Sequence, residues 1–236
     1  MKIGIIGAME VEIEQLKRAI GSGRAAECAG MEFFEGTLGQ TPVVVVRSGV
    51  GKVNAACCVQ LLADRFEVTH VINTGVGGAL AEGLTVGDIV VSTDAVHHDV
   101  DVENLGYAAG QVPGMQPAFE ADEELRDAAL AAAHAVAPEV TALAGRVASG
   151  DQFVYRPQTK QRIREVFGAA CCEMEGAAIA QACSINGLPF VIVRAISDNA
   201  DGSEPEAYPV FEEKAARHCA AIVEHMVGTG LHGDLK

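Results

Sequence analysis

Five short runs of apolar residues, rich in valine and isoleucine, constrain the fold more than any other feature of this sequence. They are continuously apolar and do not alternate as half-exposed strands do, a pattern typical of strands buried on both faces of a helix-covered, largely parallel sheet. The runs read KIGIIG, PVVVVRSG, THVINTG, DIVVSTDAV and FVIVRAIS.

Helical patterns separate these runs along the chain. Strands that alternate with helices predict an α/β fold with helices on both faces of a central sheet. Nothing in the 236 residues resembles a linker, so we expect a single domain over residues 1–236. The expected helices lie at about residues 9–21, 52–65, 121–136, 156–166, 173–186 and 208–228.

The composition limits the partners and the location of the protein. No apolar run approaches the roughly 18 residues of a membrane span, and the opening MKIGIIGAMEVE has no signal-type cleavage site. We therefore expect a cytoplasmic protein with no membrane partner. The chain has 17 basic and 32 acidic residues and a formal net charge of -15, which disfavours binding to nucleic acid.

Cysteine usage argues against disulfides and metal. The seven cysteines include the adjacent pairs Cys57–Cys58 and Cys171–Cys172 but no CxxC motif. Neighbouring residues on a helix point in different directions, which favours free, buried thiols. The spacing fits none of the usual zinc signatures, so we expect no metal site.

The carboxyl ends of the apolar runs are where ligands bind in open α/β folds. Glu12 follows the first run and Asp198 the last, while the third leads into Gly75, Gly77 and Gly78. Glycines there permit a tight turn and let a ligand approach main-chain N–H groups. Nucleotide motifs fit poorly, because GVGGAL lacks the third glycine of GxGxxG and SGVGKV lacks the first glycine and final Ser/Thr of a P-loop.

The stretch ACCEMEGAAIAQACS, residues 170–184, places two glutamates at the start of a helix of small apolar residues. A helix that is apolar on nearly every face is buried all round, so its first turn opens onto solvent or onto a site. For Glu173 we favour an interaction with the helix dipole, worth a few tenths to about 1 kcal/mol. Glu175 is the stronger candidate for a functional role.

Arg194, Ser197 and Asp198 end the last apolar run. Spacing alone supports two interpretations equally. In one, Asp198 caps the next turn and Arg194 pairs with a surface acid; in the other, these residues belong to a site. The sequence pattern does not bring residues 12, 175 and 198 together.

Eight motifs follow one another from residue 1 to about residue 228: GIIGAMEVE, SGVGKVNAA, INTGVGGAL, VGDIVVS, HHDVDVENLGYAAGQVPG, ASGDQFV, CCEMEGAAIAQ and VIVRAISDNAD. Together they resemble the motifs of the bacterial 5′-methylthioadenosine/S-adenosylhomocysteine nucleosidases, in the nucleoside phosphorylase superfamily. The resemblance implies a three-layer α/β/α sandwich with a central mixed, mostly parallel sheet. It also implies hydrolysis of the N-glycosidic bond of 5′-methylthioadenosine, S-adenosylhomocysteine and 5′-deoxyadenosine, in methionine salvage and methyl-cycle recycling, with no cofactor.

The resemblance also implies roles for individual residues. Glu12 would activate the attacking water, with Arg194 nearby. Met174 and Glu175 would lie under the ribose, where Glu175 accepts hydrogen bonds from its hydroxyls. The other implied contacts are Asp198 and Ser197 at N7 of adenine, Phe153 stacked on the purine, the main chain of Val154 at the purine edge, Gly78 among the glycines near the water, and Met9, Val50 and Tyr208 around the sulfur.

The segment DVDVENLGYAAGQVPG predicts a homodimer with shared sites. It presents Val102, Leu105, Tyr107, Val112 and Pro113 in a glycine-rich stretch that could not easily bury them in its own subunit. The resemblance implies that Val102 and Leu105 reach into the neighbouring subunit's site. One position departs from the family, since Val76 stands where many members have a serine, and the side-chain hydroxyl that would help to hold the water is absent.

Two carboxylates suit this chemistry, because an oxocarbenium-like transition state needs a base on the water and an acid on the leaving group. The nearest rival is a phosphorylase, but Glu12 would face the phosphate. Unit charges about 4 Å apart repel by roughly 4 kcal/mol at an effective dielectric near 20, so hydrolysis is favoured. Cleavage of 6-amino-6-deoxyfutalosine stays open, and a non-catalytic nucleoside-binding protein would need neither acid.

Overall fold

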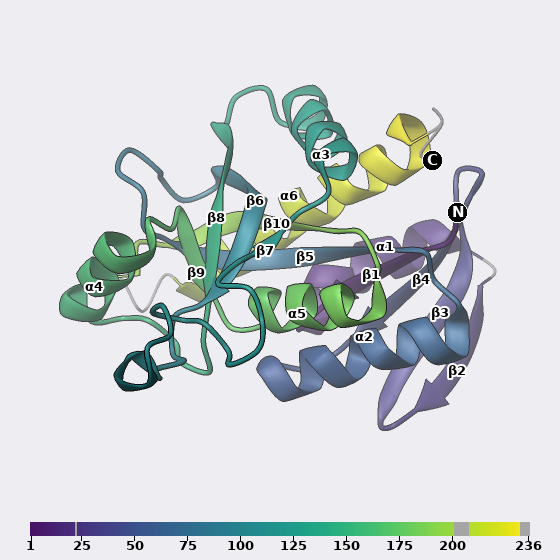
Figure 1. Cartoon of the computed structure of the whole chain (residues 1–236). Coiled ribbons are helices and arrows are strands. Elements are labelled where there is room, and N and C mark those ends of the chain that lie inside the picture. Colours follow the sequence, from purple (N-terminus) through teal and green to yellow (C-terminus); the bar gives the residue numbers. More distant parts are fainter. Residues whose placement is uncertain (22, 201–207, 232–236) are drawn as a thin grey trace.

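The computed structural model describes residues 1–21, 23–200 and 208–231, and for residues 208–210 and 230 the backbone alone. Its centre is one mixed sheet of ten strands (Figure 1). The strands are β1 Ile3–Gly7, β2 Arg24–Cys28, β3 Met31–Leu38, β4 Thr41–Arg47, β5 His70–Ala79, β6 Ile89–His97, β7 Phe119–Glu120, β8 Ala142–Ser149, β9 Cys171–Glu173 and β10 Phe190–Asp198.

The middle of the sheet is parallel, as predicted. Strand β1 pairs in parallel with β4 and with β5, and β5 pairs in parallel with β10. All five residues of β1 are buried, because helices cover both faces of these strands. Antiparallel pairs join β2 to β3 and β3 to β4 at one edge.

At the other side the sheet closes on itself. Strand β10 pairs with both β5 and β6, while β6, β8, β9 and β5 pair in turn, so these five strands form a ring. Both edges of β10 are therefore paired along part of its length. The end of β10 at Asp198 is held in register opposite Gly78 of β5.

The helices form two layers around the sheet, which confirms the expected three-layer sandwich (Figure 1). One core lies between the sheet and α2 with α5, and the other between the sheet and α1, α3 and α6. The helices are α1 Glu10–Ile20, α2 Lys52–Phe66, α3 Glu123–Val136, α4 Pro157–Phe167, α5 Gly176–Asn186 and α6 Tyr208–His225, with a 3₁₀ turn at Glu103–Leu105 and a π-helical turn at Met226–Gly230.

Two local expectations were wrong. Helix α5 begins at Gly176 and not at residue 173, because residues Cys171–Glu173 form β9 between β8 and β5. The glycines at positions 75, 77 and 78 form no turn, since β5 continues through them to Ala79. Helix α5 is buried on nearly every face, as predicted.

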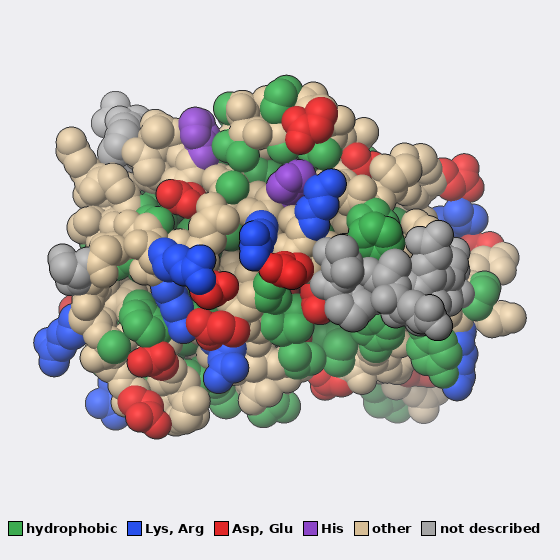
Figure 2. Space-filling view, turned by 180° about the vertical axis from the view of Figure 1, so that it is seen from behind, with side chains coloured by type: hydrophobic (Ala, Val, Ile, Leu, Met, Phe, Trp, Pro, Cys, Tyr) green, Lys and Arg blue, Asp and Glu red, His purple; other side chains and the backbone are tan. Residues whose placement is uncertain are grey.

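The surface and the cysteines agree with the composition. On the face shown in Figure 2, Lys and Arg side chains lie among Asp and Glu side chains, and those described form no continuous basic patch there. All seven cysteines lie in the described part and are free, five of them buried. None of the helices described here has the length and apolar character needed to cross a bilayer.

Candidate active site

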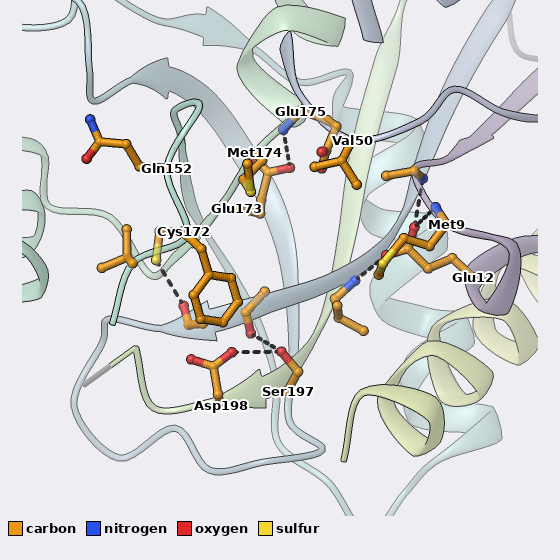
Figure 3. A pocket seen from close by; sticks show the side chains of 16 residues that line it. Met9, Glu12, Val50, Gln152, Cys172, Glu173, Met174, Glu175, Ser197 and Asp198 are labelled. Carbon is orange, nitrogen blue, oxygen red and sulfur yellow. Dashed lines mark hydrogen bonds between the residues drawn. The ribbon is translucent and has the colours of Figure 1, made fainter. Parts of the chain in front are cut away.

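One cavity lies where the carboxyl ends of β1, β4, β8, β9 and β10 meet β5 (Figure 3). Glu12 and Met9 stand on one side of it, and Asp198 and Ser197 on the other. The lining residues are Ala8, Met9, Glu12, Val50, Val76, Gly77, Gly78, Gln152, Phe153, Val154, Cys172, Glu173, Met174, Glu175, Ser197 and Asp198. The structure thus brings residues 12, 175 and 198 to one cavity.

Glu12 is positioned by the start of its own helix. It stands in the first turn of α1, and its Oε2 accepts hydrogen bonds from the main-chain N–H groups of Ala8 at 2.7 Å and Met9 at 2.9 Å. These are donors that the helix N-terminus leaves unpaired. The side chain therefore completes the helix start and is held in one orientation at the cavity.

The second oxygen of Glu12 faces β5. Glu12 Oε1 accepts a hydrogen bond from Val76 N at 3.1 Å. A Cβ atom at Gly75 would collide with this oxygen and with Arg194 Nη1, so the glycine is needed for close approach. Glu12 is 1% exposed, and burial raises its pKa against the opposing effects of Arg194 and the three main-chain donors. A raised pKa makes the carboxylate a better base.

Arg194 lies behind the cavity wall at the centre of a group of acids. Its guanidinium is 1% exposed and pairs with Glu173 and, at 3.7 Å, with Glu175. It also donates to Asn73 Oδ1 at 2.5 Å. Burial opposes the charge, but the surrounding carboxylates outweigh burial and raise the pKa of Arg194. The alternative that Arg194 pairs with a surface acid is wrong, because its partners are buried.

Glu173 is a site residue that sequence reasoning did not include. Its carboxylate accepts hydrogen bonds from the main-chain N–H groups of Glu175 at 3.1 Å and Gly176 at 2.8 Å, which supports the helix-terminus role expected for it. It also lines the cavity, pairs with Arg194 and accepts from Ser149 Oγ. This role was missed from the sequence because β9, the strand that carries Glu173, has only three residues. So short a strand has no clear alternation to show which side chains face the cavity.

Glu175 joins the wall of the cavity to the loop after β4. Its Oε1 accepts a hydrogen bond from Gly51 N at 2.8 Å, and the residue is 4% exposed. Burial, followed by the neighbouring Glu173, raises the pKa of Glu175 from 4.5 to about 7, although Arg194 and the Gly51 donor act in the opposite direction. Glu175 therefore changes its charge near neutral pH.

Asp198 makes the cap-like contact and also faces the cavity. Its Oδ1 accepts from Ala200 N at 2.6 Å, and its Oδ2 accepts from Ser197 Oγ at 2.9 Å. A Cβ atom at Gly78 would come within 3.0 Å of Asp198 Oδ1. The two interpretations left open by the sequence thus describe two contacts of one side chain.

The remaining expected residues divide into three groups. Met9, Val50, Gly78, Phe153, Val154 and Met174 line the cavity as expected, with Phe153 54% exposed at its mouth. Val102 and Leu105 do not line the cavity of their own chain, and Leu105 is 66% exposed. The side chain of Tyr208 lies outside the described residues.

Metal-binding groups are not apparent at this site. Across the described ranges, no three side chains of His, Cys, Asp or Glu come together as potential ligands of a metal ion. The acids around the cavity are instead occupied by Arg194 and by main-chain N–H groups.

Comparison with known proteins agrees with the fold. The sequence profile described as the Phosphorylase superfamily matches residues 2–228. The chain is thus a member of the phosphorylase superfamily, and its fold is consistent with that class.

Relatives that match nearly the whole chain identify its family within this superfamily. The chain is 45% identical over 224 residues to a 5′-methylthioadenosine/S-adenosylhomocysteine nucleosidase of Shewanella frigidimarina, covering 94% of this chain and 97% of the relative. The crystal structure of the Colwellia psychrerythraea enzyme of that name, in complex with adenine, superposes with a TM-score of 0.93 at 41% identity, covering 97% and 95% of the two chains. The chain belongs to the 5′-methylthioadenosine/S-adenosylhomocysteine nucleosidase family.

A second solved structure bears on the alternative substrate. The futalosine hydrolase of Helicobacter pylori superposes with a TM-score of 0.91 at 32% identity, covering 96% of this chain and 97% of that one. Proteins with this fold therefore carry both names.

The raised pKa of Glu175 predicts how the stability of the protein depends on pH. A carboxyl group whose pKa is higher in the folded state, about 7 against 4.5, binds its proton more tightly there, so its contribution to stability falls as pH rises between these values. Glutamine does not ionise, so the Glu175→Gln variant does not lose this stability as pH rises. The free energy of unfolding of the variant, relative to wild type, should be higher at pH 8 than at pH 5 by up to about 3 kcal/mol.

Urea denaturation at both pH values measures this difference. Glu82→Gln is the control, because its side chain is 86% exposed and pairs with Arg164 at the surface. Parallel stability curves for wild type and Glu175→Gln would contradict the prediction.

Proposed function

We propose that this protein hydrolyses the N-glycosidic bond of 5′-methylthioadenosine and S-adenosylhomocysteine, and also of 5′-deoxyadenosine, releasing adenine and the corresponding ribose product. The observation that carries the proposal is the placement of Glu12 and Asp198 on opposite sides of one cavity. Hydrolysis of such a bond needs a base and an acid on opposite sides of the sugar. Membership of the nucleosidase family supports the same reaction.

Glu12 acts on the attacking water. Water adds to C1′ of the ribose as the bond to adenine breaks, and Glu12 takes the proton that the water loses. Its burial and raised pKa suit it to this task. Arg194 acts indirectly, since it lies behind the wall and balances the charge of Glu173 and Glu175.

Asp198 acts on the leaving group. It delivers a proton to N7, so that adenine leaves as a neutral base. Ser197 Oγ holds one oxygen of Asp198 at 2.9 Å and so fixes its orientation. Phe153, exposed at the mouth, stacks on the purine, and the main chain of the buried Val154 contacts the purine edge.

Glu175 holds the ribose. As a carboxylate it accepts hydrogen bonds from the two sugar hydroxyls above Met174, and these bonds strengthen as the ring gains positive charge. Gly78, Met9 and Val50 line the same cavity, and Met9 and Val50 face the 5′ substituent. Tyr208 is expected there by resemblance.

Hydrolysis is favoured over phosphorolysis by the neighbourhood of Glu12. A phosphate dianion bound beside this carboxylate would meet Val76, whose side chain supplies no hydroxyl donor. The main-chain N–H of Val76 already donates to Glu12. Repulsion between unit charges about 4 Å apart costs roughly 4 kcal/mol at an effective dielectric near 20. Water is neutral and meets no such cost.

We also infer a homodimer in which each subunit completes its neighbour's site. Leu105 is 66% exposed, and Val102, Tyr107 and Val112 are half-buried. Exposed apolar side chains also stand on α2 and α5, with Val53 74% and Ile185 65% exposed. Val102 and Leu105 would cover the alkylthio end of the partner's substrate.

The free thiols support a cytoplasmic location. All seven cysteines are unpaired, including the exposed Cys57. Free thiols persist in reducing compartments, whereas secreted proteins commonly oxidise theirs. Residues 1–236 would act as one domain there.

The product assay is the decisive experiment. We expect adenine release from 5′-methylthioadenosine at the same rate with and without phosphate, and free methylthioribose as the second product. Formation of ribose 1-phosphate derivatives would instead establish a phosphorylase. Parallel assays with 6-amino-6-deoxyfutalosine test the second candidate, which the similarity to futalosine hydrolase favours.

Asp198→Asn should be the most damaging conservative change in the chain. Asparagine keeps the size and can still bond to Ala200 N, but it cannot deliver a proton. We expect kcat to fall by about 10² to 10⁴, with a small effect on KM. Asp88→Asn is a matched control, because Asp88 likewise accepts main-chain bonds, from Thr85 N at 2.7 Å and Thr141 N at 2.9 Å, away from the cavity. Near-normal turnover with a lowered melting temperature for Asp198→Asn would show that Asp198 is only a cap.

The dimer is tested by sedimentation together with kinetics. Leu105→Glu should convert the protein to monomers and raise KM for 5′-methylthioadenosine, because a charge in an apolar interface is costly to bury. A fully active wild-type monomer would disprove the shared site.

A further inference from the structure

Three side chains outside the cavity link two of the loops that form it to a third loop, which follows β6. Lys52 Nζ pairs with Asp99 Oδ1 at 2.6 Å. The other oxygen of Asp99 accepts from Asp151 N at 2.9 Å, and Asp151 Oδ1 accepts from Lys52 N at 2.8 Å. We call Lys52, Asp99 and Asp151 the loop clasp.

The loop clasp joins the start of α2 to the segments that follow β6 and β8. Lys52 and Asp151 lie within two positions of the cavity residues Val50 and Gln152, whereas Asp99 has no such neighbour, and none of the three lines the cavity. Gly51, next to Lys52, donates to Glu175, and Val50 lines the cavity. Asp151 precedes Gln152 and Phe153, which form the opposite part of the wall. The loop clasp therefore fixes the separation of these two parts of the wall.

The backbone of Gly51 makes its hydrogen bond to Glu175 depend on the position of the neighbouring Lys52. It has a φ of 98°, a value that L side chains rarely adopt, and Asp151 Oδ1 lies 3.1 Å from where its Cβ would stand. A glycine has little intrinsic preference for one backbone conformation. The direction of the Gly51 N–H group therefore depends on what holds Lys52.

Asp99 contacts the other two members of the loop clasp through the two oxygens of its carboxylate. Its side chain is 14% exposed and that of Lys52 19% exposed, so water competes little for their hydrogen bonds. The groups that face Asp99 are Lys52, His98 and the main chain of Asp151. Burial acts to raise the pKa of Asp99, but the hydrogen bonds from Lys52 and Asp151, with the charges of Lys52 and His98, outweigh burial and lower this pKa.

We propose that Asp99 is a positioning residue for the nucleosidase reaction, which holds the Gly51 N–H group on the Glu175 carboxylate through Lys52 and Asp151. The inference rests on the proposed function, in which Glu175 binds the ribose hydroxyls. Without Asp99 the start of α2 is free to shift, and Glu175 loses the main-chain donor that orients it.

The loss of that donor has a specific electrostatic effect. Glu175 faces Glu173, Glu12 and Arg194, and the Gly51 N–H group acts with Arg194 to favour its ionised form. Weakening the Gly51 contact raises the pKa of Glu175, so ionisation then requires a higher pH. The acidic limb of the pH profile of kcat/KM, which reports groups in the free enzyme, moves to higher pH.

Asp99→Asn is the variant that tests the proposal. Asparagine has the same size, but its single carbonyl oxygen can accept from Lys52 Nζ or from Asp151 N and not from both, and its NH₂ group then faces the other donor. We expect kcat/KM for 5′-methylthioadenosine to fall about 10- to 100-fold, with the acidic limb moved to higher pH. Lys52→Met should do the same, and the double variant should be little worse than either single one, because one linkage is broken.

Asp94→Asn is the matched control. Asp94 pairs with Arg146 through 2.6 Å and 2.9 Å hydrogen bonds, and its side chain is 15% exposed, close to the 14% of Asp99. This pair joins β6 to β8 away from the cavity. Asp94→Asn should lower the melting temperature and leave the acidic limb where it is in wild type.

The outcomes separate the two levels of inference. If wild type releases adenine and Asp99→Asn changes only the melting temperature, as Asp94→Asn does, Asp99 has a structural role and the proposal is wrong. Additive losses for the Lys52 and Asp99 variants would also overturn it, because the residues would then act separately. If wild type releases no adenine from any of the nucleosides, the proposed function fails first.

Discussion

The buried guanidinium of Arg194 is the constraint on which the rest of the site depends. Three carboxylates, Glu12, Glu173 and Glu175, approach it with exposures of 1 to 8%. Removing one partner from such a group leaves a buried charge uncompensated, which typically costs 3–5 kcal/mol. Strand β5 must therefore bring no side chain at Gly75, where a Cβ would meet both Arg194 and Glu12.

The acids around Arg194 also have separate partners in the backbone. Glu12 bonds to the start of α1 and Glu173 to the start of α5, while Glu175 bonds to Gly51 at the start of α2. Helix N-termini carry partial positive charge, so three helix starts and one arginine share the negative charge of the site. This explains how a cavity with so many acids forms inside an apolar fold.

The sequence predicted the fold well where its signal was local. The five apolar runs became β1, β4, β5, β6 and β10, because strands buried on both faces carry an uninterrupted pattern. Strands β2 and β3 were missed because polar residues interrupt them, as in RAAEC and MEFFEGTL. Pairings between distant residues leave no periodic trace, and Lys52 and Asp99 lie 47 positions apart. The meeting of residues 12, 175 and 198 was expected only through the resemblance to a family.

The closed ring of β5, β9, β8, β6 and β10 has a consequence for the timescales of motion around the cavity. Backbone amides in strands paired on both edges exchange with solvent only when large parts of a protein unfold, whereas loop amides exchange through small local openings. Asp198 ends such a strand, while Val50 and Phe153, 47% and 54% exposed, belong to loops. The strand that carries Asp198 is thus protected against small local openings, unlike the loops that carry Val50 and Phe153. Breathing of the cavity, and with it the passage of nucleoside and adenine, belongs to the loops after β4 and β8.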